Sequence, residues 1–138
     1  MLEKIQKALP KNFPLVMHGS SSVPKEWVDR INNAGGQMKS TSGVPEEQYL
    51  PAAKMGVCKV NIDTDLRLAM TAKIREVFAT KPAEFDPRNY LGPAREAIIG
   101  MVRRKLQPNV LNSAGKADAV IAHWEKLGKP LPTFYGKK

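Results

Sequence analysis

The sequence is poor in cysteine, histidine and aromatic residues, and it has no long hydrophobic run. Its 138 residues include one cysteine, two histidines and 7% aromatic residues. The single thiol, Cys58, excludes an intrachain disulfide and a zinc cluster built from cysteines. No run of about 18 apolar residues indicates a membrane-spanning helix. Because charges occupy the N-terminal segment MLEKIQKALP, where a signal peptide is apolar, we expect a cytoplasmic protein with no membrane partner.

Acidic residues are also scarce, and the excess of positive charge is unevenly placed. The formal net charge is +9. Residues 1–101 hold 14 Lys and Arg against 11 Asp and Glu, whereas residues 102–138 hold 8 against 2. Arg103, Arg104 and Lys105 end a helix-like segment, where cations suit the negative end of the helix dipole. No base-reading motif accompanies this charge, so we expect no nucleic-acid partner.

Hydrophobic spacing predicts alternating helices and strands. Short apolar runs indicate strands over residues 14–17 and 57–62. About 40 residues separate them, which is enough for a helical crossover, so we expect the strands to be parallel. Helices are expected over the segments 2–9, 24–34, 45–55, 64–79 and 93–106. The predicted fold class is therefore α/β.

Three prolines and one face of the second strand allow more specific predictions. Pro51 is expected to break or kink the helix that begins near Pro45. Residues 81–88 are expected to form a turn that ends before the last helix, which begins at Pro93. Alternation in the second strand places Cys58, Val60 and Ile62 on one face, and we expect that face to pack.

Polar residues follow both predicted strands, as HGSSS at 18–22 and NIDT at 61–64. The carboxyl ends of parallel strands form the ligand crevice in α/β folds. A histidine can ligate a metal, a glycine permits close approach to the backbone, and serines offer donors that suit a phosphate. The alternative is structural: a serine caps the next helix, His18 is a packed side chain, and Asp63 or Thr64 caps the helix after the second strand. Residue chemistry alone thus indicates a polar edge for a small, oxygen-rich ligand.

Four longer strings are more specific than these patterns. They are LVMHGSSSVP at 15–24, GVPE at 43–46, KVNIDTDLR at 59–67 and FDPRNYLGPA at 85–94. In this order and spacing they resemble class II fructose-bisphosphate aldolases over roughly residues 10–116. A complete (β/α)8 barrel needs about 250 residues, so the resemblance implies a partial TIM barrel with its last two strands and C-terminal helices. We expect residues 1–116 to be that part, and residues 117–138 to be a basic extension with one short helix.

The resemblance implies a role for each polar residue at the strand ends. His18 matches the last of three zinc-binding histidines. Substrate contacts are implied for a group of five residues, with Asn61 on the bound ketose or its enediolate and the others on its phosphate: Gly19, Ser21, Asn61, Asp63 and Thr64. A monovalent cation near the Gly19 backbone is implied as well. Arg88 matches an arginine that reaches across a dimer interface to the far phosphate, and the alternative for it is an ion pair with Asp86 or Glu84.

The family reaction is the reversible cleavage of fructose 1,6-bisphosphate to dihydroxyacetone phosphate and glyceraldehyde 3-phosphate. Zinc acts in it as a Lewis acid on the ketone oxygen. The sequence lacks the other two zinc histidines and the catalytic aspartate, and His123 lies outside the matched region. We therefore expect the chain to be inactive by itself and to act in a homo-oligomer or with the missing part of the barrel. A tagatose-bisphosphate aldolase and a non-enzymatic phosphate-binding or interaction module remain alternatives.

Overall fold

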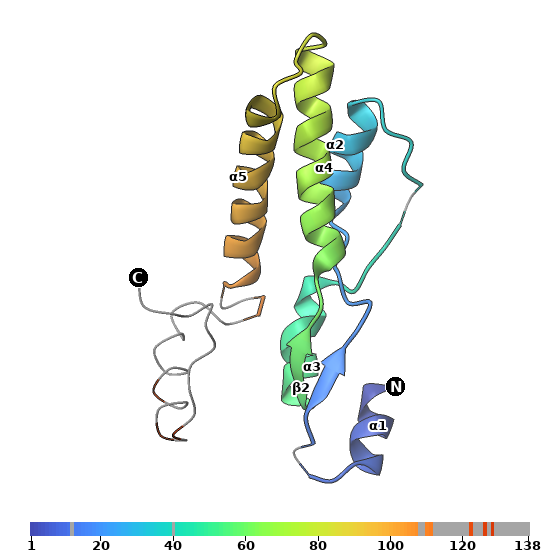
Figure 1. Ribbon diagram of the computed structural model, residues 1–138. Coiled ribbons are helices and arrows are strands. Elements are labelled where there is room, and N and C mark those ends of the chain that lie inside the picture. Colours follow the sequence, from blue (N-terminus) through green and yellow to red (C-terminus); the bar gives the residue numbers. More distant parts are fainter. Residues whose placement is uncertain are drawn as a thin grey trace.

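The structure is a computed structural model that describes residues 1–11, 13–39, 41–107, 110, 111, 122, 126 and 128. Within these ranges it has an α/β arrangement with a small parallel sheet (Figure 1). In chain order the elements are α1 (Leu2–Ala8), β1 (Leu15–Met17), α2 (Lys25–Asn33), the short 3₁₀ helix η1 (Glu46–Gln48), α3 (Tyr49–Lys54), β2 (Val57–Val60), α4 (Asp63–Thr80) and α5 (Pro87–Lys105). Of the basic extension only residues 122, 126 and 128 are described, the first two as helical, and His123 falls outside the described residues.

The two strands pair in parallel, as the spacing between them predicts. Leu15 is aligned with Val57, and Met17 is aligned with Val60. The second strand ends at Val60, which is earlier than expected. The prediction for its packed face is wrong at Cys58, which is exposed, whereas Val57 is buried. Helix α3 packs against β2, and Val57 is the buried residue of this strand.

The helices agree with the hydrophobic spacing except near prolines. Pro51 lies in the first turn of α3, where its missing N–H removes no helical hydrogen bond, and the preceding turn is the separate helix η1. The last helix begins at Pro87 and not at Pro93, so the expected start is wrong. Its true start has a cap, because the Asp86 side chain accepts a hydrogen bond from the N–H of Arg88 at 3.0 Å. Pro93 lies inside the helix.

A helical layer fixes α4 relative to the sheet. Helix α4 lies between α2 and α5 and runs away from the strand ends (Figure 1). Val28 and Ile31 of α2 pack with Leu68 and Ala72 of α4 in one buried cluster. None of the helices in the described ranges has the length and apolar character needed to cross a membrane. The packing places the first turn of α4 directly beside the strand ends.

An ion pair on this helical layer gives a first testable prediction. Arg30 of α2 donates to Glu76 of α4, with Arg30 Nη2 at 2.9 Å from Glu76 Oε2. The hydrogen bonds from Arg30 lower the pKa of Glu76 from its ordinary 4.5 to about 2. We expect Glu76→Gln to lower the free energy of unfolding at pH 7 by about 1 kcal/mol, since the pair is partly exposed and screened.

The pH dependence of this difference follows from its sign. Because the folded-state pKa of Glu76 is lowered, the stabilisation is present above pH 4.5 and is lost as the pH falls to about 2. Urea unfolding of both proteins at pH 7 and at pH 2 measures it. A stability difference that stays constant over this range would contradict the assignment to the ion pair.

Candidate functional site

The segments that follow β1 and β2 lie side by side at the carboxyl end of the sheet. The N–H of Asn61 donates to the carbonyl of Met17 at 3.1 Å. This bond brings the Asn61 side chain next to His18, with Asn61 Nδ2 at 2.9 Å from His18 Nδ1. His18 is exposed, and its Nε2 atom has no hydrogen-bond partner within the described part of the chain. The contact through Nδ1 orients the ring and leaves Nε2 open to solvent or a ligand.

Two serines after β1 connect this segment to the second strand. Ser20 is fully buried, and its Oγ donates to Met17 O at 2.7 Å and accepts from the N–H of Asn61 at 3.1 Å. Ser21 Oγ accepts a hydrogen bond from the N–H of Thr64 at 3.2 Å. The chain segment after β1 is therefore attached to the first turn of α4.

The capping alternatives from the sequence are wrong at both helices. The N-cap residue of α2 is Pro24, with no side-chain cap, so no serine caps that helix. The N-cap residue of α4 is Ile62, and neither Asp63 nor Thr64 caps the helix. Ser21 provides the missing acceptor from another strand end, a partner that local sequence rules cannot identify.

Several backbone donors at this edge point to an anion site. The N–H groups of Gly19, Ser20 and Ser21 have no acceptor within the residues that the structure describes. Gly19 has φ +60°, a left-handed conformation that favours glycine. The first turn of α4, with Asp63 and Thr64 exposed, lies at the same edge. Free N–H groups in a bend beside a helix N-terminus form a typical anion-binding arrangement.

The Asp63 carboxylate opposes an anion, but a neighbour offsets its charge. Arg67 Nη2 lies 2.7 Å from Asp63 Oδ2, one helical turn further along α4. The pair leaves the net charge of this turn less negative than the sequence suggests. An anion bound by the backbone N–H groups therefore lies near an ion pair without net charge and not near an isolated carboxylate.

Arg88 is not brought to this edge. It lies at the start of α5, at the opposite end of the helical layer from the strands (Figure 1). Its side chain is 89% exposed and pairs with Asp86 at 2.5 Å. This ion pair is the alternative that the sequence left open for Arg88.

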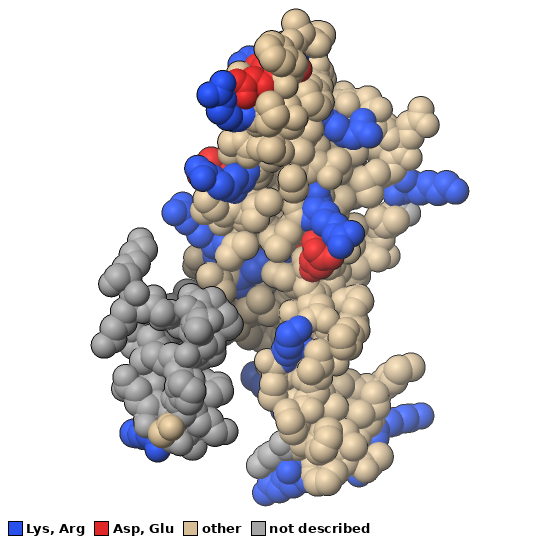
Figure 2. Space-filling view, in the orientation of Figure 1, with Lys and Arg blue, Asp and Glu red and all other residues tan. Residues whose placement is uncertain are grey.

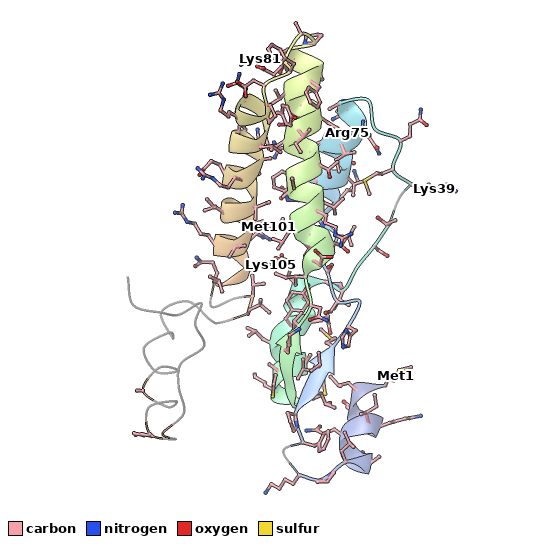
Figure 3. The ribbon with its side chains drawn as sticks, in the orientation of Figure 1. Met1, Lys39, Arg75, Lys81, Met101 and Lys105 are labelled. Atoms are coloured by element: carbon pink, nitrogen blue, oxygen red, sulfur yellow. The ribbon has the colours of Figure 1, made fainter. Side chains whose placement is uncertain are left out.

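A buried cluster of charged residues supports the segment after β1. Asp65 of α4 is 0% exposed and Lys105 of α5 is 1% exposed, with Lys105 Nζ at 2.6 Å from Asp65 Oδ2. Lys105 Nζ also donates to Ser22 Oγ and to Glu46 Oε1, both at 2.8 Å. We refer to Asp65, Lys105, Glu46 and Ser22 as the ion cluster. Figure 3 shows Lys105 at the C-terminal end of α5, near the start of α4.

Both central charges of the ion cluster persist at neutral pH. Burial raises the pKa of Asp65, but hydrogen bonds from Lys105, Ser22 and Val23 outweigh burial and hold it below the ordinary value. Burial lowers the pKa of Lys105, but hydrogen bonds to Asp65 and Glu46 outweigh burial and raise it. The cluster is therefore a true ion pair with hydrogen-bonded neighbours.

Sequence reasoning missed the role of Lys105, which it treated as one of three cations at a helix end. A signal was present in the spacing of α5. Lys105 follows the buried residues Ala94 and Met101 at helical intervals, so it lies on the buried face of the helix. A lysine on such a face needs an acidic partner.

The Tyr49 hydroxyl provides another test of this supporting structure. It donates to the carbonyl of Ser20 at 2.6 Å, and Tyr49 is 1% exposed. Tyr49→Phe leaves that carbonyl without its partner, so we expect a loss of about 1–2 kcal/mol in the free energy of unfolding. Thermal and urea unfolding measure the loss. In the control variant Tyr90→Phe the ring lies against Phe78, and the loss is expected to be smaller; equal losses would contradict the assignment.

The described residues do not form a complete metal centre. No group of three or more His, Cys, Asp or Glu side chains in the described ranges is arranged to hold a metal ion. Catalytic zinc sites use three protein ligands, and this edge offers one imidazole, that of His18. A metal bound here needs further ligands from outside the described residues.

Positive charge is distributed, and it does not form one patch on the face seen in Figure 2. Lys and Arg side chains lie at both ends of this face and along its sides, with acidic side chains beside some of them. Two of the ion pairs among the described residues join Lys25 to Asp29 and Arg30 to Glu76.

Comparison with known proteins places this α/β chain in the family that its motifs resemble. The chain belongs to the class II fructose-bisphosphate aldolase family, because the family model described as fructose-bisphosphate aldolase class-II matches residues 1–116. Two parallel strands with flanking helices are compatible with a part of a TIM barrel.

Several curated relatives carry the name fructose-bisphosphate aldolase. The protein of Treponema pallidum is 53% identical over 117 residues, which are 85% of this chain and 35% of the relative. That of Giardia intestinalis is 54% identical over 105 residues, 76% of this chain and 32% of the relative. That of Thermus caldophilus is 47% identical over 116 residues, 84% of this chain and 37% of the relative. The chain thus spans about a third of the length of the relatives it matches.

Proposed function

We propose that residues 1–116 form the C-terminal part of a class II fructose-bisphosphate aldolase, with residues 117–138 as a basic extension. The reaction is the reversible cleavage of fructose 1,6-bisphosphate to dihydroxyacetone phosphate and glyceraldehyde 3-phosphate, in the cytoplasm. One observation carries this proposal: an imidazole, an amide side chain and free backbone donors converge at the carboxyl end of two parallel strands.

The phosphate of the substrate is held by the backbone donors at this edge. The N–H groups of Gly19 and Ser21 donate to its oxygens, and the first turn of α4 adds the N–H of Asp63 and the hydroxyl of Thr64, because the N–H of Thr64 already donates to Ser21 Oγ. This assignment is supported because the N–H groups of Gly19, Ser21 and Asp63 have no hydrogen-bond acceptor in the described part of the chain. A monovalent cation at the Gly19 backbone balances the charge of the dianion.

His18 is one zinc ligand, and two more come from the remainder of the barrel. When bound, zinc polarises the ketone oxygen of the substrate. Asn61, whose amide already contacts the His18 ring, donates to an oxygen of the ketose or of its enediolate. Because the described residues offer only one metal ligand, the metal is held, and catalysis occurs, only together with the rest of the barrel.

Arg88 binds the far phosphate in an oligomer. Its planar guanidinium suits two phosphate oxygens, and its exposed ion pair with Asp86 is weak enough to be exchanged for a stronger charge. The position of Arg88, far from the strand ends of its own chain, supports a role at the site of a neighbouring subunit.

Complementation tests the proposal. The full chain is mixed with zinc and the preceding barrel part of the Treponema pallidum aldolase, and cleavage of fructose 1,6-bisphosphate and of tagatose 1,6-bisphosphate is measured. We expect activity in the mixture only, with fructose bisphosphate preferred, and none with His18→Ala. Lack of activity in a folded, stoichiometric complex would overturn the proposal.

A second function is favoured by one contrast within the site. Free backbone donors for a phosphate are present at this edge, whereas no group of three metal ligands is arranged within the described residues. A phosphate-binding or interaction module without catalysis needs only the former. Calorimetric titration of the chain with dihydroxyacetone phosphate would support this function if binding were saturable, lost in Ser21→Ala, and unaccompanied by activity in the complementation mixture.

A further inference from the structure

The ion cluster is attached through the backbone to residues 19–23, which we refer to as the phosphate segment. Asp65 Oδ2 accepts from the N–H and the hydroxyl of Ser22, both at 3.0 Å, and Asp65 Oδ1 accepts from the N–H of Val23 at 2.7 Å. A single carboxylate therefore binds two successive peptide groups directly after Ser21. The ion pair fixes a loop, whereas the pair of Arg30 and Glu76 joins only two helices.

One of these peptide groups belongs to a strained residue. Val23 has φ 50°, and it is the one described non-glycine residue with a positive φ. A β-branched side chain disfavours this conformation, which persists only where surrounding contacts impose it. The hydrogen bond from Val23 to Asp65 is such a contact. The chain thus keeps an unfavourable backbone geometry at the end of the segment in which the N–H groups of Gly19, Ser20 and Ser21 have no acceptor among the described residues.

Lys105 makes this arrangement depend on α5. Its ammonium group binds Asp65, Ser22 and Glu46, so it joins α4, α5, η1 and the phosphate segment at one point. Arg104 Nη2 binds the other oxygen of Glu46 at 2.8 Å. Two acidic and two basic groups therefore balance, and the Asp65 carboxylate remains charged to accept its backbone hydrogen bonds.

We propose that Asp65 and Lys105 are positioning residues for the phosphate site: they hold Ser22 and Val23 so that the N–H groups of Gly19 and Ser21 can bind one anion. This inference rests on the phosphate site proposed above. Stability alone does not require the arrangement, because a buried ion pair is commonly replaced by apolar residues without loss of stability. The Asp65 carboxylate supplies the acceptors for the N–H groups of Ser22 and Val23, and Lys105 balances its charge.

The test uses the full chain and the double variant Asp65→Asn/Lys105→Met, which removes one charge of each sign. The probe is inorganic phosphate, with affinity measured by ³¹P NMR titration. We expect the double variant to bind phosphate at least about tenfold more weakly, the size of effect seen when residues supporting a binding site are removed. The matched control is Arg30→Met/Glu76→Gln, which removes a second α4 ion pair distant from the loop and should leave the affinity unchanged.

Amide hydrogen exchange provides a readout that does not depend on phosphate. We expect the N–H groups of Ser22 and Val23 to exchange at least about tenfold faster in the Asp65 variant and to be unaltered in the Arg30 and Glu76 control. Unchanged exchange, or equal affinity in the double variant and the wild type, would overturn the positioning role. If the wild type itself binds no phosphate while exchange responds as expected, the proposed phosphate site fails and the loop-holding role stands. Should the double variant not fold, Asp65→Glu, which displaces the carboxylate by one methylene, is measured in the same two ways.

Discussion

Replacing Lys105 by Met is expected to lower the free energy of unfolding by about 3–5 kcal/mol at pH 7. The substitution leaves the carboxylates of Asp65 and Glu46 without their counterion. Lys105 is 1% exposed and its ammonium contacts both Asp65 and Glu46. Urea unfolding followed by circular dichroism measures the change. Arg104→Met is the control: its side chain is 62% exposed, so we expect a loss of at most about 1 kcal/mol.

Acid should reduce this difference. Since Lys105 helps to hold the pKa of Asp65 below its ordinary value, the pair stabilises the fold above the unfolded-state pKa of Asp65. That stabilisation is lost as the pH falls through the lower folded-state pKa. In Lys105→Met the Asp65 carboxyl takes up its proton at a higher pH than in the wild type. The free energies of unfolding of the two proteins therefore become more similar as the pH falls. Similar unfolding midpoints for the Lys105 and Arg104 variants at pH 7 would contradict the buried pair.

Gly43→Ala is expected to be nearly as damaging, at about 3 kcal/mol, and to abolish phosphate binding. A Cβ atom at Gly43 would lie 1.9 Å from the carbonyl oxygen of Ser21 and 2.8 Å from the carbonyl carbon of Ser22. Both are backbone atoms of the phosphate segment, and Val44 N–H already donates to that same oxygen at 3.0 Å. The methyl group can be accommodated only if the segment moves.

The control for this variant is expected to change the free energy of unfolding in the opposite direction. Gly100 lies within α5 and is exposed, and a methyl group at its Cα would meet no described atom within 4 Å. Gly100→Ala should therefore raise the free energy of unfolding by about 0.5–1 kcal/mol, because alanine loses less conformational entropy in a helix. Thermal unfolding of both variants, with phosphate titration of each, separates the two effects. A Gly43→Ala protein as stable as Gly100→Ala would show that the close approach is absent.

Local patterns in the sequence predict the elements and the polar edge. The apolar run ending at Met17 and the crossover length before Val57 are sufficient for a parallel pair, and so place His18 beside Asn61. Those inferences depend only on spacing and on the geometry of parallel strands.

The parts that could not be predicted depend mostly on partners distant in sequence. Thr64 N–H is satisfied by Ser21, 43 positions away, so the local capping rule fails at α4. Pro93 does not begin α5, because Asp86 and Pro87 provide an earlier start that the turn-like composition obscures. The ion cluster was missed because the acidic partner of Lys105 can be found only once α4 and α5 are packed together.

The contact between Lys105 and Ser22 spans 83 positions of the chain. Contacts of such separation close large loops, and their entropic cost must be met before they contribute to stability. We therefore expect the phosphate segment to be among the last features to form during folding, after the α4 and α5 hairpin has docked. A phosphate ester that binds there selects the fully assembled chain and shifts the folding equilibrium toward it.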